Sequence, residues 1–144
     1  MVNRERLVSL FRRLCLIDAP ALNERASVDY VKQYLADLGV EHYEDDAGAT
    51  IGGNAGNVIA TVKGKAMGAP RIYLSAHFDT VEPTAGLNII EQDGVLRSDG
   101  TTILGADDKG GMAPILEAIQ MLAESDAAHG DVVLLFSVAE EIGL

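Results

Sequence analysis

The sequence is poor in cysteine, proline and aromatic residues, and it has no long apolar run. Its 144 residues include one cysteine, four prolines, no tryptophan and 5% aromatic residues. The single cysteine, Cys15, excludes a disulfide within the chain, and its amphipathic surroundings favour a small buried side chain over a nucleophile. No run of about 18 apolar residues exists, so we expect no membrane-spanning segment. With 48% hydrophobic residues and so few prolines, the chain is not disordered or collagen-like.

Basic residues are also scarce. The chain has 11 lysine and arginine residues against 22 aspartate and glutamate residues, which gives a formal net charge of −11. Such a molecule repels a nucleic-acid backbone or an anionic membrane surface, so we expect no nucleic acid and no membrane as partners. Arg12 and Arg13 interrupt the N-terminal segment where a signal peptide needs an unbroken apolar run, which predicts a cytoplasmic protein.

Apolar residues recur with the periods of helices and strands. Helical spacing predicts helices over 4–17, 24–38 and 110–124, with Asn3 as a cap of the first and Gly39 as the stop of the second. Strand patterns cover 57–62, 72–76 and 132–138, and residues 88–91 and 95–98 form a predicted hairpin. The glycine-rich segment 48–57 is predicted to be a loop and matches no phosphate-binding motif.

These elements indicate an α/β fold in one domain. No internal repeat, linker or change in composition divides the chain. Residues 132–138, VVLLFSV, are apolar on both faces, which is typical of a central strand covered by helices on both sides. Helices that alternate with such strands predict an α/β layered fold, with a mixed, largely parallel sheet and helices on both faces.

Three apolar or strand-like runs each end in a cluster of polar residues. The segments are YLSAHFDTV (73–81), TILGADDKGG (102–111) and LLFSVAEEIG (134–143). Together they supply one imidazole and five carboxylates, namely His77, Asp79, Asp107, Asp108, Glu140 and Glu141. In open α/β sheets, sites gather at the carboxyl ends of strands. Since five carboxylates stay ionised in one cleft only beside a positive charge, the pattern predicts one or two divalent metal ions.

Each cluster alone has an ordinary structural explanation. His77 and Asp79 project to the same side of an extended segment, so the carboxylate could orient a metal-bound imidazole, but a structural histidine gives the same pattern. The acidic pair at 107–108 suits the start of a helix. Adjacent glutamates such as Glu140 and Glu141 are common on surfaces. The succession of all three clusters favours a metal site.

The three segments together resemble the signature blocks of a known enzyme family. SAHFDTV, SDGTTILGADDKGGMA and VAEEIG are similar to those of the dinuclear zinc peptidase family that contains peptidase T, carboxypeptidase G, acetylornithine deacetylase and succinyl-diaminopimelate desuccinylase. SDGTTILGADDKGG is most similar to the peptidase T-like, or tripeptidase, branch. The similarity extends over essentially the whole chain, from the N-terminal helices onward.

The resemblance implies a role for each matched residue. His77 would bind one zinc ion, Asp107 would bridge two zinc ions, and Glu141 would bind the second. Asp79 would orient His77, and Glu140 would be the general base.

The DDKGG block carries one further expectation. In the family the peptide bond after the bridging aspartate is commonly cis, so the resemblance implies a cis bond between Asp107 and Asp108. Asp108 and Lys109 receive no catalytic role.

The implied activity is that of a metal-dependent exopeptidase. An aminopeptidase or tripeptidase of this branch hydrolyses the N-terminal residue of short peptides through a zinc-activated water. The implied cofactors are two Zn²⁺ ions, with Co²⁺ or Mn²⁺ as alternatives. The implied partners are a short peptide substrate and, in the intact protein, a second copy bound through a lid domain.

The resemblance also sets an expectation for domain organisation. Residues 1–144 correspond to the N-terminal part of the zinc-peptidase catalytic domain and end after the Glu-Glu motif. The family's lid or dimerisation domain, a further carboxylate ligand and a late histidine would lie outside them. His42 and His129 precede the glutamate pair, so we expect both at the surface. We therefore expect these residues alone to bind zinc weakly and to be inactive.

Two other functions stay open. A deacylase of N-acyl amino acids would use the same dinuclear site with a different substrate pocket. A non-catalytic acidic domain that binds a cation is the second alternative. Calcium suits carboxylates, but no EF-hand loop is present, and His77 beside Asp79 favours zinc or a similar metal.

Overall fold

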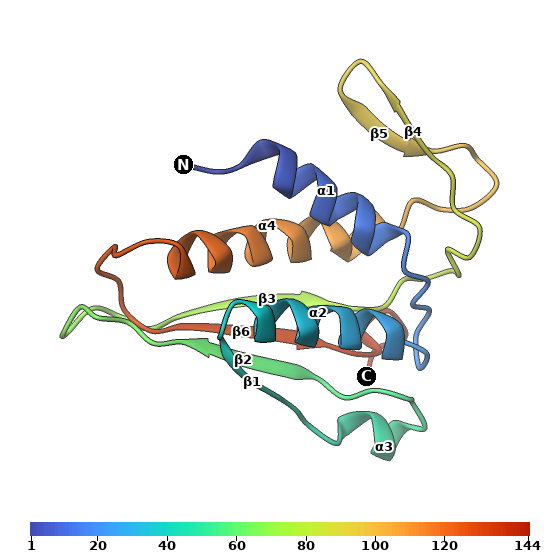
Figure 1. Ribbon diagram of the computed structural model, residues 1–144. Helices are drawn as coiled ribbons and strands as arrows, with labels where there is room; N and C mark the ends of the chain where they lie inside the picture. The colour runs from blue at the N-terminus through green and yellow to red at the C-terminus, as the bar shows by residue number, and fades with distance from the viewer.

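The computed structural model describes all 144 residues. The helices are α1 (Arg4–Cys15), α2 (Arg25–Asp37), α3 (Ala47–Ile51) and α4 (Ala106–Ala123), and a 3-10 turn spans Glu140–Ile142 (Figure 1). The strands are β1 (Glu41–Glu44), β2 (Val58–Val62), β3 (Ile72–His77), β4 (Ile89–Gln92), β5 (Val95–Ser98) and β6 (Val132–Ser137). None of the helices combines the length and the apolar character needed to span a bilayer.

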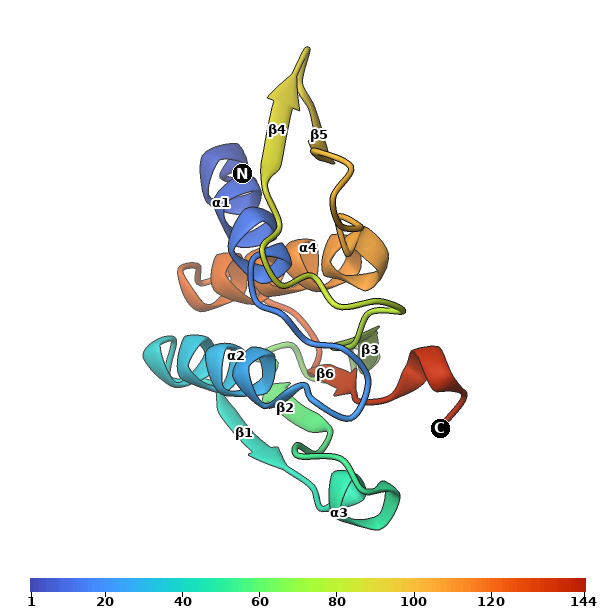
Figure 2. The same ribbon diagram turned by 90° about the vertical axis from the view of Figure 1, so that its right-hand side faces the viewer.

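Four strands form one mixed sheet in the order β1–β2–β6–β3. β3 and β6 are parallel, whereas β1 pairs with β2, and β2 with β6, in antiparallel orientation. The predicted α/β class and mixed sheet are confirmed, but two of these three pairings are antiparallel. The parallel neighbours β3 and β6 are joined by a long connection that includes the helix α4, as a parallel pair requires. β4 and β5 form a separate hairpin, which Figure 2 shows projecting from the body.

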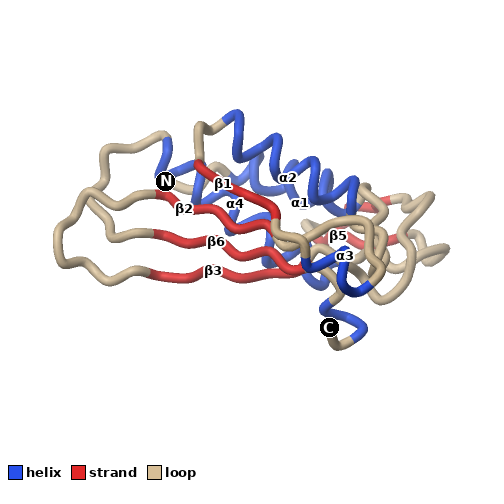
Figure 3. Tube along the Cα trace, turned by 90° about the horizontal axis from the view of Figure 1, so that it is seen from below, coloured by secondary structure: helices blue, strands red, loops and turns tan.

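The long helices α1, α2 and α4 all lie on one face of the sheet. Figure 1 shows α1 and α4 above the strands and α2 overlapping them in that view, and Figure 3 shows the opposite face with no long helix in front of the strands. Along β6, Leu134 and Phe136 are fully buried beneath the helices, whereas Leu135 on the other face is 39% exposed. The structure therefore differs from the expectation of helices on both faces, because the apolar run of β6 is covered on one side within these residues.

Most element boundaries follow the local signals. The Asn3 side chain accepts a hydrogen bond from the N–H of Arg6 at 3.1 Å and caps α1. Gly39 ends α2 with a φ of +68°. Asp93 and Gly94 adopt φ values of +54° and +76°, as a tight hairpin turn requires. Burial raises the pKa of Cys15 to about 11, which agrees with a small buried side chain rather than a nucleophile.

Two elements fall outside the predictions. β1 has the sequence EHYE, which has little apolar character and becomes a strand through its pairing with β2. α3 occupies part of the glycine-rich segment predicted to be a loop, and it lies at the end of the strands. Both elements depend on tertiary contacts, which the local pattern of apolar residues does not reveal.

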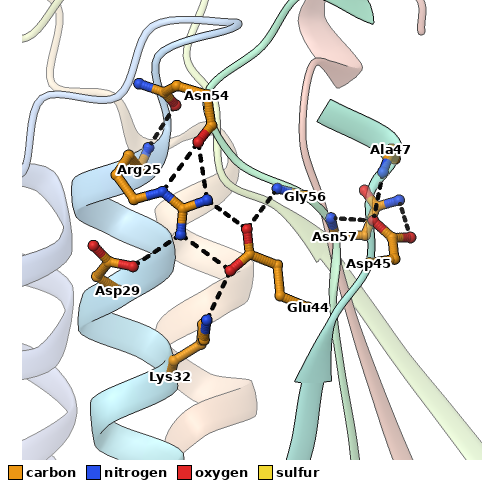
Figure 4. Close-up of polar contacts among 9 residues, drawn as sticks. All are labelled: Arg25, Asp29, Lys32, Glu44, Asp45, Ala47, Asn54, Gly56 and Asn57. Atoms are coloured by element: carbon orange, nitrogen blue, oxygen red, sulfur yellow. Dashed lines mark hydrogen bonds and ion pairs between the residues drawn. The ribbon is translucent and has the colours of Figure 1, made fainter. Parts of the chain in front are cut away.

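A network of charged side chains connects the end of β1 to α2 (Figure 4). Arg25 donates hydrogen bonds to both carboxylate oxygens of Glu44 and to the carbonyl of Asn54. Glu44 also accepts from Lys32 Nζ at 2.7 Å and from the N–H of Gly56 at 2.9 Å. Hydrogen bonds from Arg25 lower the pKa of Glu44 to about 2, with further lowering by Lys32 and Gly56 against the opposing effect of burial.

The neighbouring Asp45 fixes the start of β2. Its Oδ1 accepts from the N–H groups of Ala47 and Asn57, at 3.1 and 2.8 Å, and its Oδ2 accepts from the Asn57 side chain at 2.9 Å (Figure 4). The Asn57 amide is thereby oriented so that its Oδ1 accepts from the N–H of Val138 at 3.0 Å. The β1–β2 connection thus supports the chain directly after β6.

We predict that Glu44→Gln destabilises the fold at neutral pH and flattens its acid dependence. Because the folded pKa lies below the ordinary 4.5, the stabilisation is complete above pH 4.5 and is lost as pH falls toward 2. We expect the free energy of unfolding at pH 7 to fall by roughly 1–3 kcal/mol. This is less than the pKa shift of Glu44 alone would give, because Arg25 and Lys32 are partly exposed. Urea unfolding between pH 2 and 7 measures it, with the exposed Glu41→Gln on the same strand as control. Equal, parallel pH profiles for both variants would contradict the prediction.

Candidate metal centre

The polar clusters meet at one end of the sheet. His77 is the last residue of β3, Asp107 lies in the first turn of α4, and Glu140 and Glu141 follow β6. Because β3 and β6 are parallel neighbours, their carboxyl ends adjoin. Donor atoms of His77, Asp107 and Glu141 all lie within 4.8 Å of one another.

The two ring nitrogens of His77 face different partners. Nδ1 lies 3.0 Å from the backbone carbonyl oxygen of Asp79 and 3.3 Å from its carboxylate Oδ1. Both of these groups accept hydrogen bonds, which assigns the proton of the neutral ring to Nδ1. Nε2 is then an acceptor, 3.2 Å from Asp107 Oδ1 and 3.7 Å from Glu140 Oε2. Electron-pair donors that face one another in this way could coordinate a cation.

Asp79 is fully buried and joins the ends of β3 and β6. Its Oδ1 accepts from the N–H of Glu140 at 3.1 Å, and its Oδ2 accepts from the N–H of Glu141 at 3.0 Å. The same carboxylate therefore contacts the imidazole and fixes the backbone of the glutamate pair.

Four consecutive backbone N–H groups after β6 are bound by side-chain oxygens. Val138 donates to Asn57, Ala139 donates to Glu24 Oε1 at 3.0 Å, and the two glutamates donate to Asp79. Sequence reasoning did not single out Asn57 or Glu24. An asparagine in a glycine-rich loop and an acid ahead of a helix are ordinary, so their sequence patterns carry no signal for this role.

The two aspartates of the DDKGG block behave differently. Their peptide bond is cis, as expected. The Asp107 side chain is 87% exposed and faces the site, with its Oδ1 beside the ring of His77. Asp108 Oδ1 instead accepts from the N–H of Gly111 at 2.9 Å and caps the regular part of α4. Only Asp107 of the pair joins the donor cluster.

Lys109 is buried behind the cluster. Its Nζ donates a hydrogen bond to the backbone carbonyl of Phe78. Burial lowers the pKa of Lys109 to about 8, and the nearby charges of Asp79 and Glu24 oppose that shift. The ammonium group thus supplies positive charge beside two fully buried carboxylates.

Negative charge at the open side of the site has no such partner. The Glu140 side chain is 58% exposed. Desolvation raises the pKa of Glu141, and the charges of Asp107, Asp79 and Glu140 raise it further, against the opposite effect of His77. Crowded carboxylates of this kind favour a bound cation.

The cluster lies at an open edge, away from the apolar cavity of the structure. That cavity, of about 670 Å³, lies at the other end of β3, where Ile72, Leu74 and Val132 line it with the C-terminal part of α4. The candidate metal site is therefore defined by the donor atoms themselves and not by an enclosed pocket.

Comparison with known proteins identifies the family. Residues 57–144, more than half of the chain and the part that holds every predicted site residue, match the model of peptidase family M28. The chain belongs to peptidase family M28. The relation to peptidase T is also confirmed, since the M28 chain is 54% identical to peptidase T of Vibrio parahaemolyticus over 50 residues, which are 34% of this chain and 12% of that protein.

Longer relatives match over the whole M28 chain. It is 42% identical over 144 residues to the uncharacterised protein YqjE of Bacillus subtilis, covering 100% of this chain and 38% of that protein. The crystal structure of aminopeptidase PepT from Bacillus cereus superposes with a TM-score of 0.93 and 42% identity. A tripeptidase from Staphylococcus aureus superposes with a TM-score of 0.93 and 38% identity. Each covers 99% of this chain, which spans 38% of either structure.

The clustered residues of this M28 chain have the chemistry of metal ligands. One imidazole nitrogen and two carboxylate oxygens are ligands that zinc and related cations accept. The proton on Nδ1 of His77, held by Asp79, leaves Nε2 free to bind, as in other metal-bound histidines. The group of His77, Asp107 and Glu141 could therefore hold a metal ion.

We predict that His77→Ala weakens Zn²⁺ binding at least about tenfold, because even the loss of a group that only orients a ligand costs 10–100-fold. Calorimetric titration of the purified protein measures the affinity. His42→Ala is the matched control, since His42 lies on β1 and outside the cluster. Equal zinc affinity in the two variants would mean that His77 is not a ligand.

Proposed function

We propose that this chain is part of a metal-dependent aminopeptidase that releases the N-terminal residue of short peptides. The observation that carries the proposal is the convergence of His77, Asp107 and Glu141 within 4.8 Å at the ends of two parallel strands. The similarity to aminopeptidase PepT of Bacillus cereus and to the tripeptidase of Staphylococcus aureus supports the peptide substrate class.

In the proposed site, His77, Asp107 and Glu141 would hold two Zn²⁺ ions, with Asp107 as a ligand of both, and Co²⁺ or Mn²⁺ could replace zinc. A bound zinc ion supplies positive charge that polarises a peptide carbonyl and lowers the pKa of water. Asp79 keeps the proton of His77 on Nδ1 and so holds Nε2 ready as a ligand.

Glu140 is the proposed general base. It lies at the site, with Oε2 3.7 Å from His77 Nε2, but it is not one of the three clustered donors. It therefore has a carboxylate free to take the proton of the attacking water and pass it to the leaving amine.

We further propose that residues 1–144 form the N-terminal part of the catalytic domain and that other segments complete it. Two zinc ions need more ligands than His77, Asp107 and Glu141 provide, since zinc is four-coordinate in most protein sites. The helix-free face of the sheet, where Tyr73 is 67% exposed, is suited to packing against further elements. The 144 residues alone would bind zinc weakly and be inactive, and a lid domain would carry any dimer contact.

We predict that the full-length polypeptide cleaves a tripeptide with a free N-terminus and that a metal chelator abolishes the cleavage. Amino-acid release from a tripeptide and from its N-acetylated twin, each with and without chelator, measures this. Cleavage of the free peptide alone supports an aminopeptidase. Release of only the acyl group would replace the proposal with a deacylase on the same metal site, and no chelator-sensitive hydrolysis of either would contradict it.

We predict that Glu140→Gln lowers kcat by about 10²–10⁴-fold, the usual contribution of a general base, while zinc stays bound. Steady-state kinetics and zinc stoichiometry of the same preparation measure the two effects. Glu82→Gln, in the exposed segment after β3, is the control for removal of one negative charge. A Glu140→Gln protein with full activity would exclude Glu140 as the base.

A further inference from the structure

Glu24 is fully buried although it lies at the start of a helix, where acidic residues ordinarily face solvent. It occupies the N-cap position of α2, yet its side chain makes no capping hydrogen bond to that helix. Its Oε1 accepts instead from the N–H of Leu22 at 2.9 Å and from the N–H of Ala139 at 3.0 Å. The second bond joins residues 115 positions apart.

Ala139 is the residue at which the chain turns from β6 toward the glutamate pair. It adopts the left-handed region, with φ of +57° and ψ of +28°, which is unfavourable for a residue with a Cβ atom. Such a conformation persists where the surroundings hold it. The carboxylate of Glu24 binds the N–H group of this residue directly.

A buried carboxylate needs compensation for its lost hydration. Glu24 Oε2 has no hydrogen-bond partner among the protein groups, but the buried cation Lys109 lies close enough for its charge to act on Glu24 and Asp79. Two buried carboxylates and one ammonium group thus lie behind the turn. The carboxylates bind its N–H groups from two sides, Glu24 at Ala139 and Asp79 at the two residues that follow.

We propose that Glu24 is a positioning residue of the metal centre. Its carboxylate fixes the turn at Ala139 and so sets where the base Glu140 and the ligand Glu141 lie. The roles of these two glutamates rest on the proposed function, whereas the positioning of the turn does not.

Three variants of the full-length polypeptide separate positioning from general stability. Glu24→Met removes the acceptor at similar side-chain length. Glu24→Gln keeps Oε1 as an acceptor and removes only the charge. Glu117→Met is the matched control, since Glu117 is a 2% exposed carboxylate that binds Arg6 of α1 and its cap residue Asn3 and makes no hydrogen bond to the turn.

The first readout is amide hydrogen exchange at residues 139–141, which needs neither metal nor substrate. We expect exchange there to be at least about tenfold faster in Glu24→Met, close to normal in Glu24→Gln, and unchanged in Glu117→Met. The second readout is Co²⁺ affinity, followed by the visible absorption of the bound ion. We expect it to fall about 10–100-fold in Glu24→Met, the usual cost of losing a group that orients ligands, and to recover largely in Glu24→Gln. In an active enzyme kcat falls by a similar factor with a smaller change in KM.

Unchanged exchange and unchanged Co²⁺ affinity in a folded Glu24→Met protein would overturn the proposal. If that variant does not fold, Glu24→Asp provides the test. Its shorter side chain moves the carboxylate away from the N–H of Ala139 while keeping the charge. Normal exchange and affinity in a folded Glu24→Asp protein would overturn it equally. Altered exchange and cation binding in a protein that cleaves no peptide would refute the proposed function and leave this inference intact.

Discussion

The candidate site depends on one buried carboxylate that bonds two strand ends together. Asp79 follows β3, and its two oxygens accept the N–H groups of Glu140 and Glu141 beyond β6. Its backbone carbonyl and its Oδ1 also face Nδ1 of His77. Because a carboxylate accepts several bonds at once, this side chain orients the imidazole and the glutamate backbone together. Without it, the parallel pairing of β3 and β6 would bring the segments close but would not aim their side chains.

Much of the fold could be predicted from the sequence because its signals are local. The helical stripes of α1 and α2 and the Asp93–Gly94 turn depend on neighbours within a few residues. β1 and α3 could not be predicted, since the strand character of EHYE comes from β2 beside it. The apolar run of β6 indicated burial on both faces, but the pattern cannot say which elements provide the cover. Here only one face has helices.

The candidate site also has a part that could be predicted from the sequence and a part that could not. That His77, Asp107, Glu140 and Glu141 lie together could be predicted, because these polar residues follow predicted strands or open a predicted helix, and parallel topology brings such segments to one edge. The groups that hold the glutamate turn gave no such signal. Glu24 and Asn57 have residue types that are ordinary at helix starts and in loops, and only their long-range hydrogen bonds reveal their part. Patterns in a sequence identify reactive side chains better than the acceptors that fix the backbone beneath them.

The donors of the cluster come from three segments separated by about thirty residues each, and they meet only when β3 and β6 pair across the α4 crossover. An unfolded chain offers no such arrangement, so a cation that binds here binds the native state alone. By mass action, its binding free energy is added to the free energy of unfolding. With the proposed site in use, metal supply would govern how long the folded molecule persists as well as its chemistry. A cell short of the cation would hold a chain that is less stable and more readily degraded.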